Sequence, residues 1–398
     1  MPPHGPAPQP PDSDIRARAI AMIARLVGFD TTSRDSNLPL IHFVRDHLAD
    51  HGISATVLPN ADGTKANLFA TIGPTVPGGV VLSGHTDVVP VDGQPWDTDP
   101  FTLTERNGRL YGRGTADMKS FPAIALALLP DMLAAPLKRP IHLALSYDEE
   151  VGCLGAPAMI RAMVASLPPM RAVIVGEPTE MRVVGAHKGI HAWRTTVTGR
   201  EAHSSQTHRG VNAVMVAAEL VHWLSGQAAA RAAHPQTDSP FDPPWSTITC
   251  GVIHGGTALN ILARDCMFLW DMRAMPDDDP MAVEAAFRAE SARLEHAMHM
   301  IAPDTGIQTT LLAAAPALRP EADSEADRLV RSITGDNTTG AVSFAAEAGQ
   351  FQEAGLSTIM CGPGNIDQAH QPNEFITLAQ VEAGIAFLQG IIARQTTP

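Results

Sequence analysis

The segment that determines the fold is Val80-Val81-Leu82-Ser83-Gly84-His85-Thr86-Asp87. In it, a short apolar run leads directly into a His-x-Asp pair. The run is typical of a β-strand. Open α/β sheets bind ligands where their strands leave the sheet, so we expect His85 and Asp87 to face such a site. Taken alone, the pair is weak evidence. A histidine in a turn, followed by an aspartate that caps the loop, has the same sequence.

Strand and helix patterns alternate around this segment. Apolar residues recur at helical spacing over residues 15–27, 38–50 and 118–133. Short β-rich or continuously apolar runs predict strands at residues 54–58, 67–72, 79–83, 140–147 and 171–175. This alternation predicts an α/β fold.

The pattern changes near Gly185. Strands are predicted at residues 189–197, 246–253, 265–273 and 306–312, and helices at 211–224 and 280–298. The α/β pattern returns at residues 323–333, 358–361 and 377–393. We therefore expect an inserted α+β domain at 186–314 between two parts of an α/β domain, 14–185 and 315–398. The proline-rich residues 1–13 are expected to form a flexible leader.

Composition excludes several classes of function. The 398 residues include 42 acidic and 28 basic ones, for a net charge of −14. No Lys/Arg cluster is available to neutralise phosphates, so neither nucleic acid nor an anionic membrane is an expected partner. No apolar stretch reaches the roughly 18 residues of a membrane span. Four scattered cysteines predict reduced thiols. These features favour a cytoplasmic protein that acts on small molecules.

Acidic residues gather where further strands end or helices begin. Asp117 follows a Gly-rich turn, Asp148-Glu149-Glu150 ends one predicted strand and Glu177 follows another. Asp117 alone has the position of an ordinary helix cap. Together, so many carboxylates at one sheet edge require cations, because a desolvated carboxylate must be paired or bound to metal. His370, in a Gly/Pro-rich loop, is either a further ligand or a solvated imidazole.

These residues form a donor set of two histidines and at least three carboxylates. Nitrogen and oxygen ligands without thiolates suit Zn²⁺, Co²⁺ or Mn²⁺ better than they suit a structural, cysteine-rich zinc site. Five ligands are too many for one tetrahedral ion but fit two divalent ions if a carboxylate bridges them. Of the neighbours Glu149 and Glu150, one can bind metal while the other accepts a proton from water and passes it to a leaving amine.

Five ordered motifs carry a family resemblance. They are Ser83-Gly84-His85-Thr86-Asp87, Gly112-Arg113-Gly114-Thr115-Ala116-Asp117, Asp148-Glu149-Glu150-Val151-Gly152, Gly176-Glu177-Pro178-Thr179 and Gln368-Ala369-His370. From about residue 15 to residue 393 the chain resembles the dizinc amidohydrolases, a family that includes acetylornithine deacetylases, desuccinylases and aminoacylases. The resemblance implies an orienting role for Asp87 toward His85 and makes Glu149 the general base and acid. The metal ligands that it implies are His85, Glu150, Glu177, His370 and a bridging Asp117.

The resemblance also implies a fold and a partner. The fold is α/β, with a central mixed sheet flanked by helices and interrupted by an inserted α+β dimerisation (lid) domain, in a homodimer. His203 matches the histidine that reaches the partner's active site to stabilise the oxyanion; a surface histidine is the alternative. Asn260 and Arg273 match residues that grip the substrate carboxylate. The alternative for Arg273 is an ordinary ion pair at a strand end.

Acetylornithine deacetylases are the most similar branch, on residues 175–179, 185–189 and 347–351. That branch implies hydrolysis of N2-acetyl-L-ornithine to L-ornithine and acetate, a step of arginine biosynthesis. Gln350 stands where desuccinylases carry an arginine. Its neutral amide cannot form the paired, charge-assisted hydrogen bonds that an arginine makes with a substrate carboxylate. Ala345-Ala346 departs from the usual Gly-Thr, which leaves a broader N-acyl-amino-acid deacylase, a succinyl-diaminopimelate desuccinylase and a dipeptidase as alternatives. Glu347 either attracts the ornithine ammonium or fixes a loop.

Overall fold

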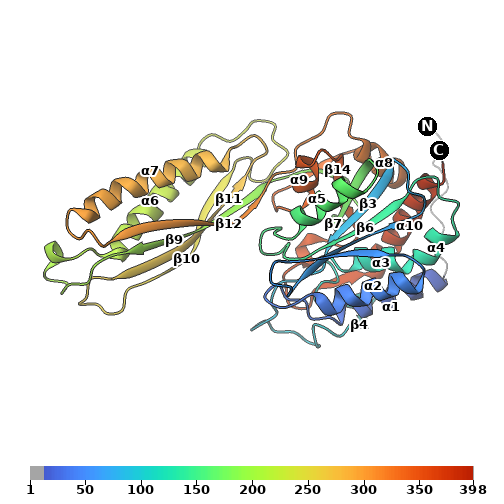
Figure 1. The fold of residues 1–398 in the computed structure, drawn as a ribbon, viewed down its shortest axis with the longest axis horizontal. Coiled ribbons are helices and arrows are strands. Elements are labelled where there is room, and N and C mark those ends of the chain that lie inside the picture. The colour runs from blue at the N-terminus through green and yellow to red at the C-terminus, as the bar shows by residue number, and fades with distance from the viewer. Residues whose placement is uncertain (1–12, 398) are drawn as a thin grey trace. The chain divides into compact units, whose positions relative to one another are not determined.

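The computed structural model describes residues 13–397, which form two compact units (Figure 1). The first unit runs to Ala186 and resumes as Arg319–Gly340 and from Ala346 onward. The second unit is His187–Leu318 with Ala341–Ala345, so it is inserted in sequence between parts of the first. The leader predicted for residues 1–13 falls outside the described residues, except for residue 13, which begins a helix.

An eight-stranded sheet in the order β1-β2-β6-β3-β7-β14-β8-β13 forms the centre of the first unit. The four strands β6, β3, β7 and β14 are parallel, while β2 and β8 add antiparallel neighbours, so the sheet is mixed. The strands are β1 Ala55–Pro59, β2 Ala66–Ile72, β3 Gly79–His85, β6 Ile141–Ser146, β7 Met170–Pro178, β8 Val184–His187, β13 Gly340–Val342 and β14 Thr358–Gly362.

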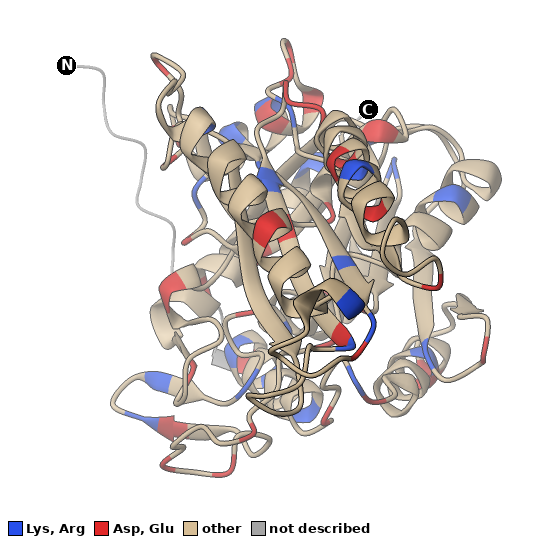
Figure 2. Cartoon of the chain, turned by 90° about the vertical axis from the view of Figure 1, so that its left-hand side faces the viewer, with Lys and Arg blue, Asp and Glu red and all other residues tan. Residues whose placement is uncertain are grey.

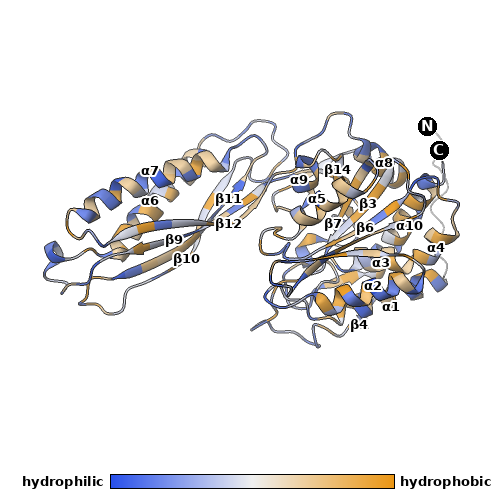
Figure 3. Ribbon diagram, viewed as in Figure 1, coloured by the Kyte–Doolittle hydropathy of each residue, from blue (hydrophilic) through white to orange (hydrophobic). Residues whose placement is uncertain are grey.

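Helices cover both faces of this sheet (Figure 1). Helices α1, α3 and α10 pack together, and α5 packs with α9. Every residue of β3 and β6 is buried, and a strand that is covered on both faces needs a continuous apolar run (Figure 3). The helices are α1 Ser13–Val27, α2 Leu38–Asp50, α3 Ser120–Ala127, α4 Leu129–Ala134, α5 Ala156–Ser166, α8 Glu325–Thr334, α9 Ala348–Glu353 and α10 Leu378–Gln395.

The single helix predicted over residues 118–133 is wrong, because the chain forms two helices there, α3 and α4. Pro130 explains the break. Its nitrogen cannot donate a hydrogen bond and its ring obstructs the preceding turn. The proline therefore lies in the first turn of α4, where it is tolerated. Helices α5 and α9 lie outside the predicted set.

A small three-stranded sheet brings two distant loops together. Its order is β15-β5-β4, with β15 Phe375–Thr377, β5 Arg109–Tyr111 and β4 Thr104–Arg106. Phe375 pairs with Tyr111 in an antiparallel ladder. This pairing places the segment before β15 beside the segment that follows β5.

The second unit is an antiparallel sheet in the order β10-β11-β9-β12, with two helices. Along β11 every second residue is buried, as expected of a sheet with one covered face. Stacked Trp193 and Trp270, with ring centroids 4.1 Å apart, lie in its core. This unit is α+β, as predicted. Its elements are β9 Gly189–Thr198, β10 Thr247–Gly255, β11 Asp265–Ala274, β12 Gly306–Ala315, α6 Ala213–Ala232 and α7 Pro280–His299.

The distribution of charge and hydropathy agrees with this architecture. Basic and acidic positions are interspersed over the face drawn in Figure 2. Hydrophobic colours follow the central strands of the first unit in Figure 3. Among the described helices, none combines the length and the apolar character that a membrane crossing requires.

Candidate metal centre

Neighbouring parallel strands deliver the predicted ligands to one edge of the large sheet. His85 is the last residue of β3 and pairs in register with Ser146, the last residue of β6, so residues 147–150 leave the sheet at the same edge. Glu177 lies near the end of β7, on the other side of β3. Asp117 comes from the turn before α3. The carboxyl ends of parallel strands thus form the site, as open α/β sheets favour.

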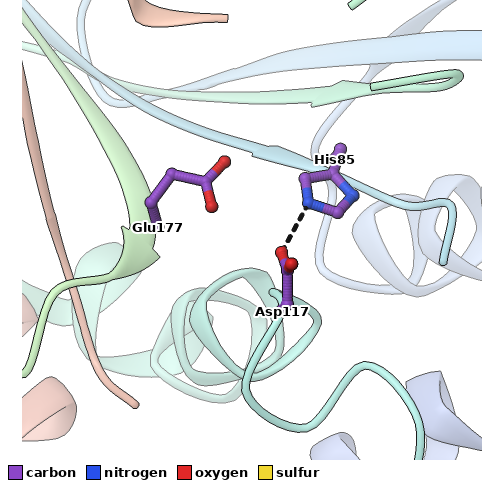
Figure 4. Close-up of side chains that lie close together, drawn as sticks. All are labelled: His85, Asp117 and Glu177. Carbon is purple, nitrogen blue, oxygen red and sulfur yellow. Dashed lines mark hydrogen bonds and ion pairs between the residues drawn. The ribbon is translucent and has the colours of Figure 1, made fainter. Parts of the chain in front are cut away.

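The first group of candidate metal ligands is His85, Asp117 and Glu177, whose donor atoms all lie within 4.8 Å of one another (Figure 4). Nε2 of His85 is 3.0 Å from Oδ1 of Asp117. All three side chains are buried. Within the described part of the chain, Oε1 of Glu177 is buried without a hydrogen-bond partner, which is costly unless a cation neutralises it.

The second group is Asp117, Glu150 and His370, again within 4.8 Å. Nε2 of His370 is 3.0 Å from Oε2 of Glu150 and 3.2 Å from Oδ2 of Asp117. Asp117 belongs to both groups and turns one oxygen toward each histidine. A carboxylate in this position is placed to bridge two ions.

The donor set fits two divalent cations. Three carboxylates face two imidazoles, and one buried carboxylate oxygen has no partner. Oxygen and nitrogen donors in these numbers suit Zn²⁺, Co²⁺ or Mn²⁺. The described residues therefore support the prediction of a two-metal site.

Burial and crowding shift the ionisation of these groups. Burial and the charge of Asp117 raise the pKa of Glu150 to about 7 and raise that of Glu177 well above its usual range. Burial also acts to raise the pKa of Asp117, but hydrogen bonds from His370 and His85 outweigh it and lower that pKa. Hydrogen bonds to Asp117 and Glu150 raise the pKa of His370 to about 10. Metal binding displaces such protons, because ligands bind in their deprotonated forms.

Glu149 lies outside both ligand groups. Its Oε1 accepts a hydrogen bond from the Cys153 thiol at 3.3 Å. Burial and the negative charge of Glu150 raise the pKa of Glu149 to about 8. A carboxylate that adjoins the ligands without belonging to either group is placed to exchange protons.

Asp87 holds the loop that carries both glutamates. Its carboxylate accepts the amide hydrogens of Glu149 at 3.1 Å and Glu150 at 3.3 Å, and the hydroxyl of Ser33 at 2.7 Å. Nδ1 of His85 donates to the main-chain oxygen of Asp87 at 2.9 Å, and is 3.6 Å from its carboxylate. Asp87 therefore contacts His85 mainly through its main-chain carbonyl oxygen. Its carboxylate instead holds the main chain of Glu149 and Glu150.

Glu347 is buried against β3 and β6, the strands that carry its two side-chain donors. Its two carboxylate oxygens accept hydroxyl hydrogens from Ser83 and Ser146, each at 2.6 Å. The side chain is 1% exposed. This geometry favours the alternative in which Glu347 fixes local structure, and its role toward a substrate ammonium stays a prediction.

The remaining predicted residues lie in the second unit. His203 and Asn260 come together because the amide of Ser204 donates to the carbonyl of Asn260 at 2.9 Å. His203 is exposed. Nε of Arg273 lies 3.0 Å from Oδ2 of Asp271, which is the ion pair named as its alternative. Their roles toward substrate stay predictions.

Two residues at the site are missing from the predicted set, Arg113 and Glu374. They form an ion pair of 2.7 Å in which both side chains are 1% exposed. Each lies four residues from a ligand, Asp117 or His370. Arg113 also lies within the Gly-rich motif that precedes Asp117. Neither this motif nor the spacing distinguishes a buried ion pair from two surface charges.

Comparison with known proteins identifies the family. Residues 81–394 match the model of peptidase family M20/M25/M40. The chain belongs to this family. It is 36% identical over 389 residues to an acetylornithine deacetylase of Myxococcus xanthus, covering 94% of this chain and 97% of that protein. An acetylornithine deacetylase of Proteus mirabilis is 34% identical, with 89% of each chain covered.

Solved structures of the M20 family share the fold. The metallo-carboxypeptidase Sso-CP2 of Sulfolobus solfataricus has a TM-score of 0.74 at 16% identity, covering 97% of this chain and 100% of that one. Human carnosine dipeptidase 1 has a TM-score of 0.72 at 17% identity, covering 96% and 97%. The dinuclear metal-binding peptidase YXEP of Bacillus subtilis has a TM-score of 0.60 at 13% identity, covering 96% and 99%.

Membership in the M20 family confirms three predictions made from the sequence. The family resemblance is correct, and so is the mixed α/β fold with an inserted unit. The class of protein, a metal-dependent amidohydrolase, is confirmed as well.

Proposed function

We propose that this M20 protein hydrolyses the acetyl amide of N2-acetyl-L-ornithine to L-ornithine and acetate, as a step of arginine biosynthesis in the cytoplasm. The observation that carries the proposal is the pair of ligand groups joined by Asp117, in a chain 36% identical to an acetylornithine deacetylase over 94% of its length. The four cysteines, all free, agree with a reducing compartment.

His85, Asp117 and Glu177 would hold one divalent ion, and Asp117, Glu150 and His370 the other. Zinc is our first choice for both ions, with cobalt or manganese as alternatives. When bound, such ions polarise a substrate carbonyl and make a water molecule more acidic. Asp87 keeps the loop of Glu150 in place while these ligands converge.

Glu149 moves the protons in this proposal. Its carboxylate takes one proton from the attacking water and delivers it to the nitrogen of the departing amine, as the carbon–nitrogen bond breaks. The water molecule thereby supplies the new oxygen of acetate and the two hydrogens that the amide nitrogen gains in becoming the ammonium group of ornithine. The Cys153 thiol donates to Oε1 of Glu149 and keeps that carboxylate oriented.

The second unit supplies substrate contacts in this proposal. The guanidinium of Arg273, with Asn260, binds the α-carboxylate of the substrate. His203 stabilises the oxyanion in the active site of a partner subunit within a homodimer. The exposure of His203 is compatible with a contact outside its own chain. Sedimentation of the purified protein measures the oligomeric state, and a monomer would contradict this arrangement.

Release of free amine from N2-acetyl-L-ornithine tests the function. The purified protein is stripped of metal with a chelator and reloaded with zinc or cobalt, and N-acetyl-L-methionine, N-succinyl-diaminopimelate and a dipeptide are assayed in parallel. We expect metal-dependent turnover that is fastest on acetylornithine. Faster turnover of another substrate would keep the chemistry and reassign the specificity. No turnover on any of them with two ions bound would contradict the proposal.

A further inference from the structure

The carboxylate of Glu374 is surrounded by donors from the loop that carries Asp117. Oε1 of Glu374 accepts the amide hydrogens of Ala116 at 2.8 Å and Asp117 at 3.1 Å. Oε2 accepts the amide of Gly114 at 3.1 Å and Nη1 of Arg113 at 2.7 Å. Successive main-chain amides around a buried carboxylate form an anion cradle that fixes the path of the backbone. The orientation of Asp117 therefore depends on Glu374.

The same network reaches the loop that carries His370. Nη1 of Arg113 also donates to the carbonyl of Gln371 at 3.2 Å, and its Nη2 donates to Oε1 of Gln94 at 2.5 Å. Nε2 of Gln94 donates to the carbonyl of His370 at 3.0 Å. Glu374, Arg113 and Gln94 thus connect the main chains of two ligands, Asp117 and His370.

The loop of His370 needs such support. His370 and Asn373 both have positive φ angles, 63° and 58°. Residues other than glycine hold this left-handed conformation only where their surroundings impose it. The amide of Asp97 donates to the side chain of Asn373 at 2.9 Å, which adds one more fixed point beside Glu374.

We propose that Glu374 is a positioning residue that sets the geometry of the second ligand group, Asp117, Glu150 and His370. The inference rests on the metal ligands of the proposed function. The first group depends on Glu374 less, because His85 and Glu177 lie in strands β3 and β7. Loss of the Glu374 carboxylate leaves Arg113 buried without its partner and releases both loops. Removing an outer partner of metal ligands typically weakens metal binding about 10- to 100-fold.

Cobalt titration of the metal-free protein tests this inference. Calorimetry counts the bound ions and gives their affinities, and visible absorption reports the ligand geometry of each ion. We expect wild type to bind two Co²⁺ ions. In Glu374→Gln the ion held by the second group should bind about 10- to 100-fold more weakly with an altered spectrum. The ion held by His85 and Glu177 should lose less affinity, because it shares only Asp117 with the affected group. Two ions bound with wild-type affinity and spectrum would overturn the inference and leave the proposed function intact.

Glu284→Gln is the matched control. Glu284 is also buried, and it also accepts from a guanidinium, that of Arg288, and from the indole of Trp193, but in the second unit. We expect this variant to bind both ions as wild type does. Equal weakening in the control would overturn the specific role of Glu374, because any lost buried acceptor would then suffice.

Gln94→Ala keeps the inference testable if Glu374→Gln does not fold. Gln94 is partly exposed. Its loss removes the link between Arg113 and the His370 carbonyl, together with a hydrogen bond from the Trp96 indole at 3.1 Å. We expect a smaller weakening that is confined to the same ion. Unchanged binding of both ions would overturn the proposed network. A wild-type chain that binds fewer than two ions would instead contradict the metal centre of the proposed function, and the inference with it.

Discussion

The two ligand groups share Asp117 but are built in different ways. His85 and Glu177 belong to strands of the large sheet and are 1% and 3% exposed. Glu150 and His370 lie in loops, and the His370 side chain is 52% exposed. We call these pairs the strand pair and the loop pair.

The difference lies in what holds each pair in place. The ladders between β3, β6 and β7 fix the strand pair, so its geometry is a consequence of the fold itself. Separate side-chain hydrogen bonds instead of strand ladders hold the loop pair, among them that of Asp87 to the Glu150 amide and that of Gln94 to the His370 carbonyl. Loops on a rigid scaffold commonly carry function because they can be adjusted without rebuilding the core.

The largest expected effect is on catalytic turnover and comes from Glu149, which lies outside both ligand groups. Glu149→Gln should lower turnover of acetylornithine about 10²- to 10⁴-fold, because the variant cannot accept the proton of water. Both ions should remain bound, because Glu149 lies outside both ligand groups. Steady-state kinetics and metal analysis of the same sample check the two statements. Substantial turnover, with contaminating enzyme excluded, would refute the role of Glu149.

Replacing one ligand in each pair tests directly whether the two pairs differ in how firmly they are held. His370→Gln should lower the affinity for one ion about a hundredfold and leave the other ion bound. The effect should be at least as large as that of losing a residue that supports a ligand from outside the metal site. Limited chelator should remove that same ion first from wild type, because its histidine is exposed. His85→Gln should also cost the protein stability, because it leaves buried carboxylates unpaired. Metal content and denaturation curves distinguish these outcomes. Equal release of both ions would contradict the asymmetry.

The strand pair and Glu150 are largely predictable from sequence, and His370 is not. The apolar run before His85 predicts a buried strand, and residues that follow parallel strands meet at one sheet edge. No periodicity places His370, whose loop returns to Asp117 across the small sheet. The residues alone leave His370 open between a ligand and a solvated imidazole, and the family resemblance favours the ligand.

The Arg113–Glu374 ion pair, which supports the loop pair, cannot be predicted from local sequence patterns. Arg113 and Glu374 are 261 positions apart, and each resembles a surface charge in its own segment. Their burial follows from the tertiary pairing of β15 with β5, which no short window of sequence encodes. The break between α3 and α4 is the opposite case. The effect of a proline on a helix is local, so Pro130 alone is enough to predict it.

The smallest expected effect concerns the sheet that carries the strand pair. His142, in β6, is 1% exposed and is hydrogen-bonded at Nδ1 to Thr71 at 2.9 Å. Its Nε2 has no hydrogen-bond partner among residues 13–397. Burial lowers the pKa of His142 to about 4. The unfolded chain binds a proton at this histidine from about pH 6.5 downward, whereas the folded chain does not until about pH 4. Acid between these values therefore favours unfolding.

Denaturation of the metal-free protein measures this effect without interference from the ligands' ions. From about pH 6 to about pH 5, the wild-type free energy of unfolding should fall by about 1 kcal/mol more than that of His142→Asn, which has no titrating ring. Above about pH 7 the difference between the two proteins should stay constant. Parallel curves over the whole range would show that the buried imidazole does not govern acid sensitivity. The sheet beneath the strand pair would then owe its response to acid to other groups.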